Sequence, residues 1–87
     1  MKTLAEITGE NIRVRRLKLC MSQEVLSGLI GAGHQTVVSS WENGRNCPTA
    51  VYLYNLADVF GCSDDSLMGR DSDAYSIMLL HQLPILP

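Results

Sequence analysis

The 87-residue chain lacks the features of an exported, membrane-spanning or metal-binding protein. Its longest strictly apolar run, residues 77–80, has four residues, whereas a bilayer-spanning helix needs roughly 20. The first residues, Met-Lys-Thr-Leu-Ala-Glu, contain no apolar core of the kind that secretion signals carry. Cys20, Cys47 and Cys62 form no Cys-x-x-Cys motif and have no histidine at a ligand spacing. We therefore expect a cytoplasmic protein that spans no membrane and holds no metal.

The chain also lacks the sequence patterns of small enzymes. No glycine-rich nucleotide loop is present, and Ser39-Ser40 stands outside the Gly-x-Ser-x-Gly context of a serine nucleophile. His34 has no acidic or cysteine partner close to it in the sequence. The composition, 46% hydrophobic and 18% charged, is typical of a globular chain with room for one core. We expect a protein that is not an enzyme and needs no cofactor.

A strong excess of positive charge is missing as well, since the net charge is −2. Proteins that bind nucleic acids are usually basic, so this number alone argues against that class. The charge is nevertheless segregated: residues 1–54 carry six Lys and Arg against four Glu, and residues 55–87 carry one Arg against five Asp. The N-terminal part is therefore able to face a phosphate backbone while the acidic part points elsewhere.

Helix-start and helix-stop residues divide the first 69 residues into five short helices, which predicts an all-α fold. Thr3 and Glu6 have capping-box spacing, so the first helix begins at Thr3, or else nearer Gly9 because glycine weakens its first half. The N-caps expected for three later helices are Ser22, Thr49 and Ser63. The predicted helices span about residues 4–19, 23–30, 34–42, 50–60 and 64–68.

The apolar positions of these helices indicate which side chains form the core. The expected core, in chain order, is Leu4, Ile12, Leu19, Val25, Leu26, either Leu29 or Ile30, Val38, Trp41, Leu53, Leu56, Ala57 and Phe60.

Residues 22–42 meet the physical demands of a helix-turn-helix. Two helices that cross steeply need a turn of small residues, which Gly31-Ala32-Gly33 supplies. The second helix of such a pair buries one apolar stripe, here Val38 and Trp41, and presents polar side chains on its other face. Short uncharged hydrogen-bonding groups on that face suit the major groove of DNA.

Short motifs in a fixed order extend this pattern along the chain. They are Met-Ser-Gln-Glu-Val-Leu (21–26), Gly31, Thr36-Val37, Trp-Glu-Asn-Gly-Arg (41–45), Pro48, Leu-Ala-Asp-Val-Phe-Gly (56–61) and Ser-Asp-Asp-Ser-Leu-Met-Gly (63–69). With these motifs, residues 9–69 resemble the lambda-repressor-like (Cro type, XRE) helix-turn-helix proteins. The resemblance implies a compact five-helix domain over residues 1–69 that binds double-stranded DNA, followed by a short C-terminal tail over residues 70–87.

The resemblance also implies roles for individual residues, and the chemistry of each residue allows its role. Base contacts are expected from Gln35, Thr36, Ser39 and Ser40. Phosphate contacts are expected from Arg13, Gln23, His34, Asn43, Arg45 and Thr49. A helix cap is the alternative role of His34, and Gln23 is also expected to brace the third helix. Arg16 and Glu42 are expected to form an internal salt bridge, with a phosphate contact as the alternative role of Arg16. For Arg13 and Arg15 the alternative is a solvated surface position.

One departure from the family pattern affects the base contacts. Nine residues lie between Gly31 and Trp41, one more than the family usually has. If the extra residue lies in the turn, the outward face of the third helix keeps Gln35, Thr36 and Ser40. If it forms a bulge at Val37-Val38, the exposed set rotates by about 100°.

The most favoured function is a sequence-specific transcriptional regulator that binds a near-palindromic operator as a homodimer. The tail, an additional helix or a short strand over residues 74–83, is expected either to pack on the core or to form the dimer interface. The apolar residues for this interface are Tyr75, Ile77, Met78, Leu79, Leu80 and Leu83. The alternative function is an antitoxin-like interaction module, which keeps the fold and binds a protein partner through the tail and the acidic C-terminal third.

Overall fold

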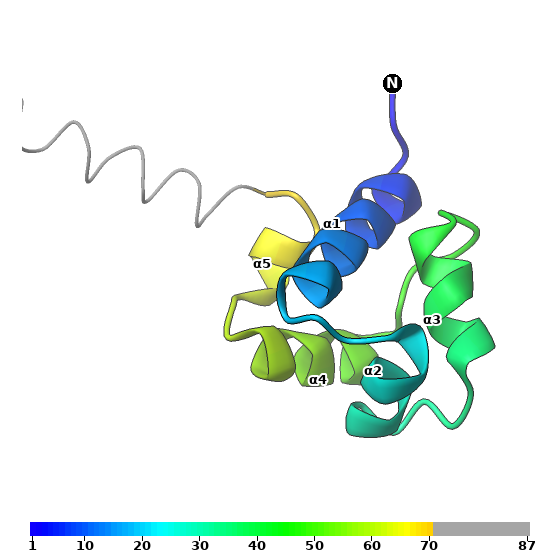
Figure 1. Cartoon of the computed structure of the whole chain (residues 1–87). Coiled ribbons are helices and arrows are strands. Elements are labelled where there is room, and N and C mark those ends of the chain that lie inside the picture. Colours follow the sequence, from blue (N-terminus) through cyan, green and yellow to red (C-terminus); the bar gives the residue numbers. More distant parts are fainter. Residues whose placement is uncertain (71–87) are drawn as a thin grey trace, which may run out of the picture.

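The computed structural model describes residues 1–70, and this part of the chain is helical throughout, without strands (Figure 1). The helices are α1 (Leu4–Lys18), α2 (Gln23–Leu29), α3 (Gln35–Glu42), α4 (Ala50–Phe60) and α5 (Asp64–Leu67). Helix α3 packs against α1 and α2, whereas α5 packs against α1 and α4 on the other side of α1. The predicted all-α fold is confirmed, and each boundary agrees with the prediction to within one residue. The predictions for residues 74–83, including their apolar interface residues, lie outside the described residues.

Helix α1 begins where its capping box predicts. The Thr3 hydroxyl accepts a hydrogen bond from the backbone N–H of Glu6 at 3.1 Å, and the Glu6 carboxylate accepts one from the backbone N–H of Thr3 at 2.8 Å. The backbone N–H and the hydroxyl of Thr3 stabilise the carboxylate and lower the pKa of Glu6. The helix continues without a break through Gly9, so the alternative start near Gly9 is wrong.

Gly9 allows the backbones of α1 and α3 to touch. A Cβ atom at Gly9 would lie 1.9 Å from the carbonyl oxygen of Trp41 and 2.9 Å from its carbonyl carbon. Both are backbone atoms in the last turn of α3, so neither is able to swing aside as a flexible side chain would. The residue that weakens α1 by propensity therefore sets the closest approach of the two helices.

The core lies between the helices and is smaller than the sequence predicted. Its buried hydrophobic side chains are Ile12, Leu26, Ile30, Val38, Trp41, Leu56, Ala57 and Leu67, and Leu53 and Phe60 pack at its edge. Trp41 also contacts the ring of Tyr52, with ring centroids 5.3 Å apart.

Three predicted core positions are wrong: the exposed fractions are Leu4 53%, Leu19 49% and Val25 51%. Of the alternatives Leu29 and Ile30, Ile30 is buried and Leu29 is 59% exposed. Leu4 lies in the first turn of α1 and Leu19 caps its end, both near the limits of the helix's packed face. In α2, Leu26 and Ile30 are four residues apart and share the inward face, which turns Val25 and Leu29 toward solvent.

The turn between α2 and α3 absorbs the extra residue. Gly31 and Gly33 have φ angles of 73° and 82°, in the left-handed region that glycine adopts without strain. Helix α3 then runs unbroken from Gln35, after the extended N-cap His34. The bulge considered for Val37-Val38 is therefore wrong.

Side-chain caps are present at two of the three other predicted positions. Ser22 accepts from the N–H of Val25, and Ser63 accepts from the N–H of Ser66, each at 3.0 Å. Thr49 occupies the N-cap position of α4, but its side chain makes no capping hydrogen bond, which corrects that prediction. Helix α4 starts instead on its backbone, with the carbonyl of Thr49 accepting from the N–H of Leu53.

Gly9→Ala is expected to destabilise the fold by about 1–3 kcal/mol, because the new methyl group overlaps the α3 backbone. Thermal unfolding followed by circular dichroism measures the effect as a fall in Tm of roughly 4 °C or more. Gly28→Ala in α2 is the matched control, since nothing lies within 4 Å of its added Cβ. That variant should gain about 0.5–1 kcal/mol from helix propensity alone. Equal stabilisation by both alanines would contradict the close approach at Gly9.

Candidate nucleic-acid interface

Helix α3 has one buried face and one uncharged polar face. Val38 and Trp41 point into the core and fix the rotation of the helix about its axis. On the other side Gln35 and Thr36 are exposed, and Ser39 and Ser40 are partly exposed. The structure thus brings the four predicted base-contact residues together on the outer side of one helix. In Figure 1 this helix lies at the edge of the molecule away from α5.

A buried ionic network joins α3 to α1 and α2. Arg16 of α1 donates to both carboxylate oxygens of Glu42, with Nε···Oε2 at 2.7 Å and Nη2···Oε1 at 2.9 Å. Gln23 of α2 donates from Nε2 to Oε1 of the same carboxylate at 3.0 Å. Arg16 also donates from Nη1 to the carbonyl oxygen of Met21 at 2.8 Å. The salt bridge expected between Arg16 and Glu42 is thus present, and it holds the last residue of α3.

Burial makes this network electrostatically strong. The side chains of Arg16 and Glu42 are only 10% and 3% exposed. The hydrogen bonds to Glu42 raise the pKa of the Arg16 guanidinium further above its ordinary value. Glu42 is the single acidic residue of α3, so its pairing removes from the polar face the one charge that would repel phosphate.

His34 caps the start of α3. Its Nδ1 accepts from the backbone N–H of Thr36 at 3.2 Å and lies 2.9 Å from the Thr36 hydroxyl. A cap of this kind satisfies one of the free amides of the first turn. The first turn of α3 therefore owes part of its order to His34, and of the two roles expected for this residue the structure shows the helix cap.

The segment after α3 folds back on the helix. The backbone N–H of Arg45 donates to the carbonyl of Ser40 at 3.1 Å, and Ser40 donates from its hydroxyl to Asn46 Oδ1 at 3.1 Å. Asn43 approaches the Ser39 hydroxyl through Nδ2 at 3.4 Å. These contacts place the loop that carries Arg45 beside the end of the polar face.

The predicted phosphate contacts occupy different surroundings. Arg13 is exposed and lines, with Asn43, a hollow of about 370 Å³ between α1 and the end of α3. Arg45 is exposed in the loop after α3, and Thr49 is exposed directly before α4. Arg15, in contrast, donates from Nη2 to the Ser66 hydroxyl of α5 at 2.7 Å, so it is neither a purely solvated side chain nor directed toward α3.

Three asparagines have structural roles that the sequence analysis missed. Asn46 holds Ser40, as described above. Asn55 of α4 donates to the carbonyl of Ile30 at the end of α2 at 3.2 Å. Asn11 of α1 donates to the carbonyls of Ser66 and Leu67 at 3.4 and 3.0 Å. In a single sequence these amides look like ordinary surface residues, since no local pattern marks them.

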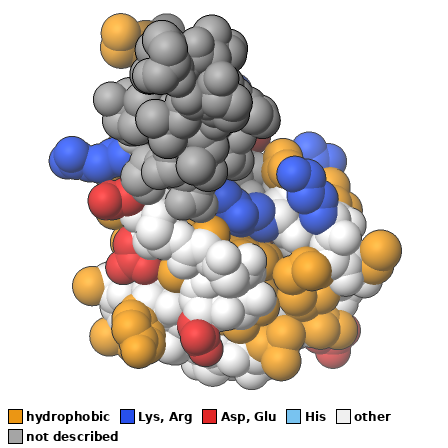
Figure 2. All heavy atoms as spheres, turned by 90° about the vertical axis from the view of Figure 1, so that its left-hand side faces the viewer, with side chains coloured by type: hydrophobic (Ala, Val, Ile, Leu, Met, Phe, Trp, Pro, Cys, Tyr) orange, Lys and Arg blue, Asp and Glu red, His pale blue; other side chains and the backbone are white. Residues whose placement is uncertain are grey.

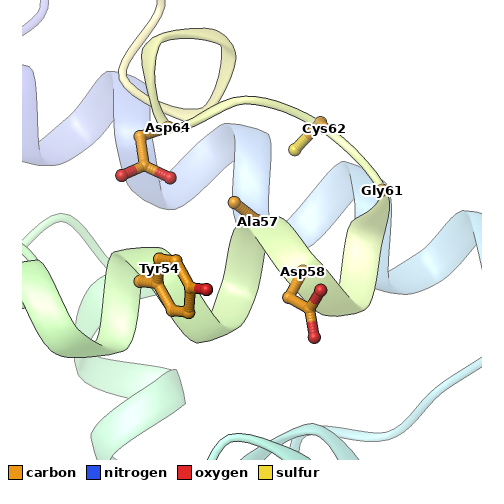
Figure 3. A pocket seen from close by; sticks show the side chains of 6 residues that line it. All are labelled: Tyr54, Ala57, Asp58, Gly61, Cys62 and Asp64. Atoms are coloured by element: carbon orange, nitrogen blue, oxygen red, sulfur yellow. The ribbon is translucent and has the colours of Figure 1, made fainter.

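The acidic residues of α4 and α5 gather away from α3. Figure 3 shows Asp58 and Asp64 beside a hollow of about 320 Å³, which Tyr54 and Cys62 also line. This hollow is lined by α4, the turn after it and the first residue of α5. Its carboxylates would repel phosphate. The charge segregation inferred from the sequence therefore corresponds to two regions of the fold, the acidic hollow at α4 and α5 and the surface around α3.

Two further features concern residues 1–70 as a whole. No helix there combines the length and the hydropathy needed to cross a bilayer. The same residues contain no group of three or more His, Cys, Asp or Glu side chains arranged to hold a metal ion.

Arg16→Met should destabilise the fold by about 3–5 kcal/mol, because it leaves the buried Glu42 carboxylate without its cation. Urea unfolding followed by circular dichroism measures the loss. The double variant Arg16→Met/Glu42→Leu removes both charges and should recover most of the lost stability. A single variant as stable as the parent chain would show that the network contributes little.

Comparison with known proteins identifies the family. The profile of the helix-turn-helix family matches residues 12–67, which is more than half of the chain. Repressor protein C2 of Salmonella phage P22 is 33% identical over 66 residues, which cover 76% of this chain and 30% of that protein. The HTH-type transcriptional regulator DicA of Escherichia coli (strain K12) is 36% identical over 73 residues, covering 84% of this chain and 53% of that protein.

The chain thus spans about a third and about half of the lengths of these two relatives. Both names describe regulators of transcription, and neither describes an enzyme. No solved structure matches the chain significantly. The resemblance inferred from the motifs is confirmed: with the family profile, the relatives and the geometry of α2 and α3 in agreement, the chain belongs to the lambda-repressor-like (XRE) helix-turn-helix family.

Proposed function

We propose that the chain is a sequence-specific DNA-binding regulator of transcription, in which α3 enters the major groove. The observation that carries the proposal is the outer face of α3, which is polar, uncharged and freed from its one carboxylate by the Arg16–Glu42 pair. The name of each relative, a repressor and a transcriptional regulator, supports the same class of function.

Gln35 and Thr36 are the central base contacts in this proposal, with Ser39 and Ser40 one turn further along α3. A glutamine amide is able to bond adenine through two hydrogen bonds, and a threonine methyl group is able to pack on the methyl group of thymine. The Ser40 hydroxyl already donates to Asn46, which leaves its oxygen as an acceptor. The burial of Val38 and Trp41 sets the rotation of α3 about its axis, and this rotation leaves the four residues on the outer side of the helix.

The phosphate contacts frame α3 on both sides. Arg13 and Asn43 line the hollow beside the end of α3, and Arg45 and Thr49 follow it in the chain. Gln23 donates one of its two amide hydrogens to Glu42. Its backbone N–H, in the first turn of α2 where no helix carbonyl accepts from it, is able to donate to a phosphate. His34 keeps its second ring nitrogen for a phosphate while Nδ1 caps α3.

We further propose that the chain binds as a homodimer in the cytoplasm, with residues 1–69 as the DNA-binding domain and residues 70–87 contributing to the dimer interface. Two copies of α3 would then lie about 34 Å apart in successive major grooves. Exposed apolar surface supports association: hydrophobic side chains lie on the right and at the lower left of the face in Figure 2, and several large ones in the described chain are about half exposed.

The acidic C-terminal third favours a second candidate, a module that binds a protein partner. The hollow between Asp58 and Asp64 would suit a basic side chain of that partner. In this candidate the fold is kept, and binding does not depend on DNA sequence or on Gln35 and Thr36.

Gln35→Ala or Thr36→Ala should weaken binding to the preferred duplex by about 1–3 kcal/mol and leave non-specific binding nearly unchanged. Arg45→Ala should instead weaken binding to every sequence. The slope of log K against the logarithm of salt concentration should fall in magnitude by about one, because one phosphate contact is lost. The measurement is fluorescence anisotropy with a selected and a scrambled duplex at several salt concentrations.

Asp58→Asn is the control, since it changes charge by one unit away from α3 and should leave the sequence preference unchanged. A chain without any preferred duplex at low salt, together with a partner that binds independently of salt, would favour the protein-interaction module.

A further inference from the structure

We propose that His34 is a positioning residue. It fixes the orientation of the Thr36 hydroxyl and so determines which bases Thr36 is able to contact in the major groove. The inference rests on the proposed function, because it takes Thr36 to lie at a base edge. It concerns one ring nitrogen, Nδ1 of His34, which contacts two groups of the same residue.

The direction of both hydrogen bonds follows from the donors. The backbone N–H of Thr36, 3.2 Å from Nδ1, is only able to donate, so Nδ1 is the acceptor. A histidine nitrogen that accepts carries no hydrogen, and the neutral ring then holds its hydrogen on Nε2. The Thr36 hydroxyl, 2.9 Å from the same unprotonated Nδ1, faces an acceptor as well, so it shares the Nδ1 lone pair with the backbone N–H and donates its hydrogen to His34.

This assignment restricts what Thr36 presents to DNA. With its hydrogen directed to His34, the hydroxyl offers only lone pairs, and the methyl group offers an apolar contact. Lone pairs match the amino groups of adenine and cytosine in the major groove, and the methyl group matches thymine. The acceptor atoms of guanine receive no hydrogen from Thr36. With His34 in place, binding should therefore disfavour guanine at the base pair that Thr36 contacts.

The surroundings of His34 add one charged group. Glu24 of α2 lines the same hollow of about 220 Å³ as Ser27, Gly33, His34 and Gln35. The first turn of α3 has no acidic residue, so no carboxylate of that turn competes with Thr36 for the ring.

The test is selection of bound sites from random duplex DNA at pH 8, with base preference scored at every position. The chains compared are the parent, His34→Ala, Thr36→Val and the double variant. His34→Ala releases the hydroxyl, and at one base pair the preference against guanine should fall about 2- to 12-fold, the range expected for one hydrogen bond. Thr36→Val should alter preference at the same base pair, and adding His34→Ala to it should change nothing further there.

A cap control separates positioning from helix stability. Ser22→Ala removes the N-cap of α2, a comparable hydrogen bond that does not touch Thr36. It should lower affinity without changing the base preferences, and circular dichroism verifies that each variant is folded.

The inference is overturned if His34→Ala lowers affinity evenly at all positions, or if it changes the preferences equally with and without Thr36→Val. In either case His34 acts as a helix cap or a phosphate contact and does not position Thr36, and the proposed function stands. If the parent chain selects no site at all, the proposed function itself fails, and this inference fails with it.

Discussion

The position of α3 depends on the buried pairing of Arg16 with Glu42. One carboxylate, almost fully removed from water, receives hydrogen bonds from α1 through Arg16 and from α2 through Gln23. Breaking such a pair leaves an uncompensated buried charge, so the three helices have one favourable arrangement rather than a range of them. Gly9 acts at the same junction, since the absence of its side chain lets α1 approach the backbone of Trp41. Together these contacts hold the C-terminal end of α3, while His34 orders its first turn.

The same pairing explains how a chain of net charge −2 suits a polyanion. The carboxylate of α3 is neutralised inside the fold, and Asp58 and Asp64 lie beside a hollow of α4 and α5. Arg13 and Arg45 remain exposed. Local placement of a few charges therefore matters more for this fold than the overall sum, because water and salt screen interactions between distant surface charges.

Local signals in the sequence were sufficient where the structure is determined by neighbours in the chain. The capping box of Thr3 and Glu6, the cap at Ser22 and the glycine turn each act over a few residues, and each was predicted. The order of family motifs, rather than any local rule, was what paired Arg16 with Glu42 across 26 positions.

Features that arise only when helices meet were not predictable in this way. Periodicity placed Leu4, Leu19 and Val25 in the core, but the helices that would have to cover them lie elsewhere. Helix propensity marked Gly9 as a weak point of α1. A single sequence does not reveal that the backbone of another helix packs against this glycine. Asn11 and Asn55 reach carbonyls at helix ends that are distant in sequence, and no spacing rule links them.

The most direct test of the role of α3 is two-dimensional NMR of the isotope-labelled chain, titrated with the duplex that it selects. If α3 enters the major groove, the largest shifts will fall on the amides of residues 34–40 and of the loop 43–49, and residues 58–65 will change little. Shifts confined to α4 and α5, or an unchanged spectrum at saturating duplex, would contradict a nucleic-acid interface on α3.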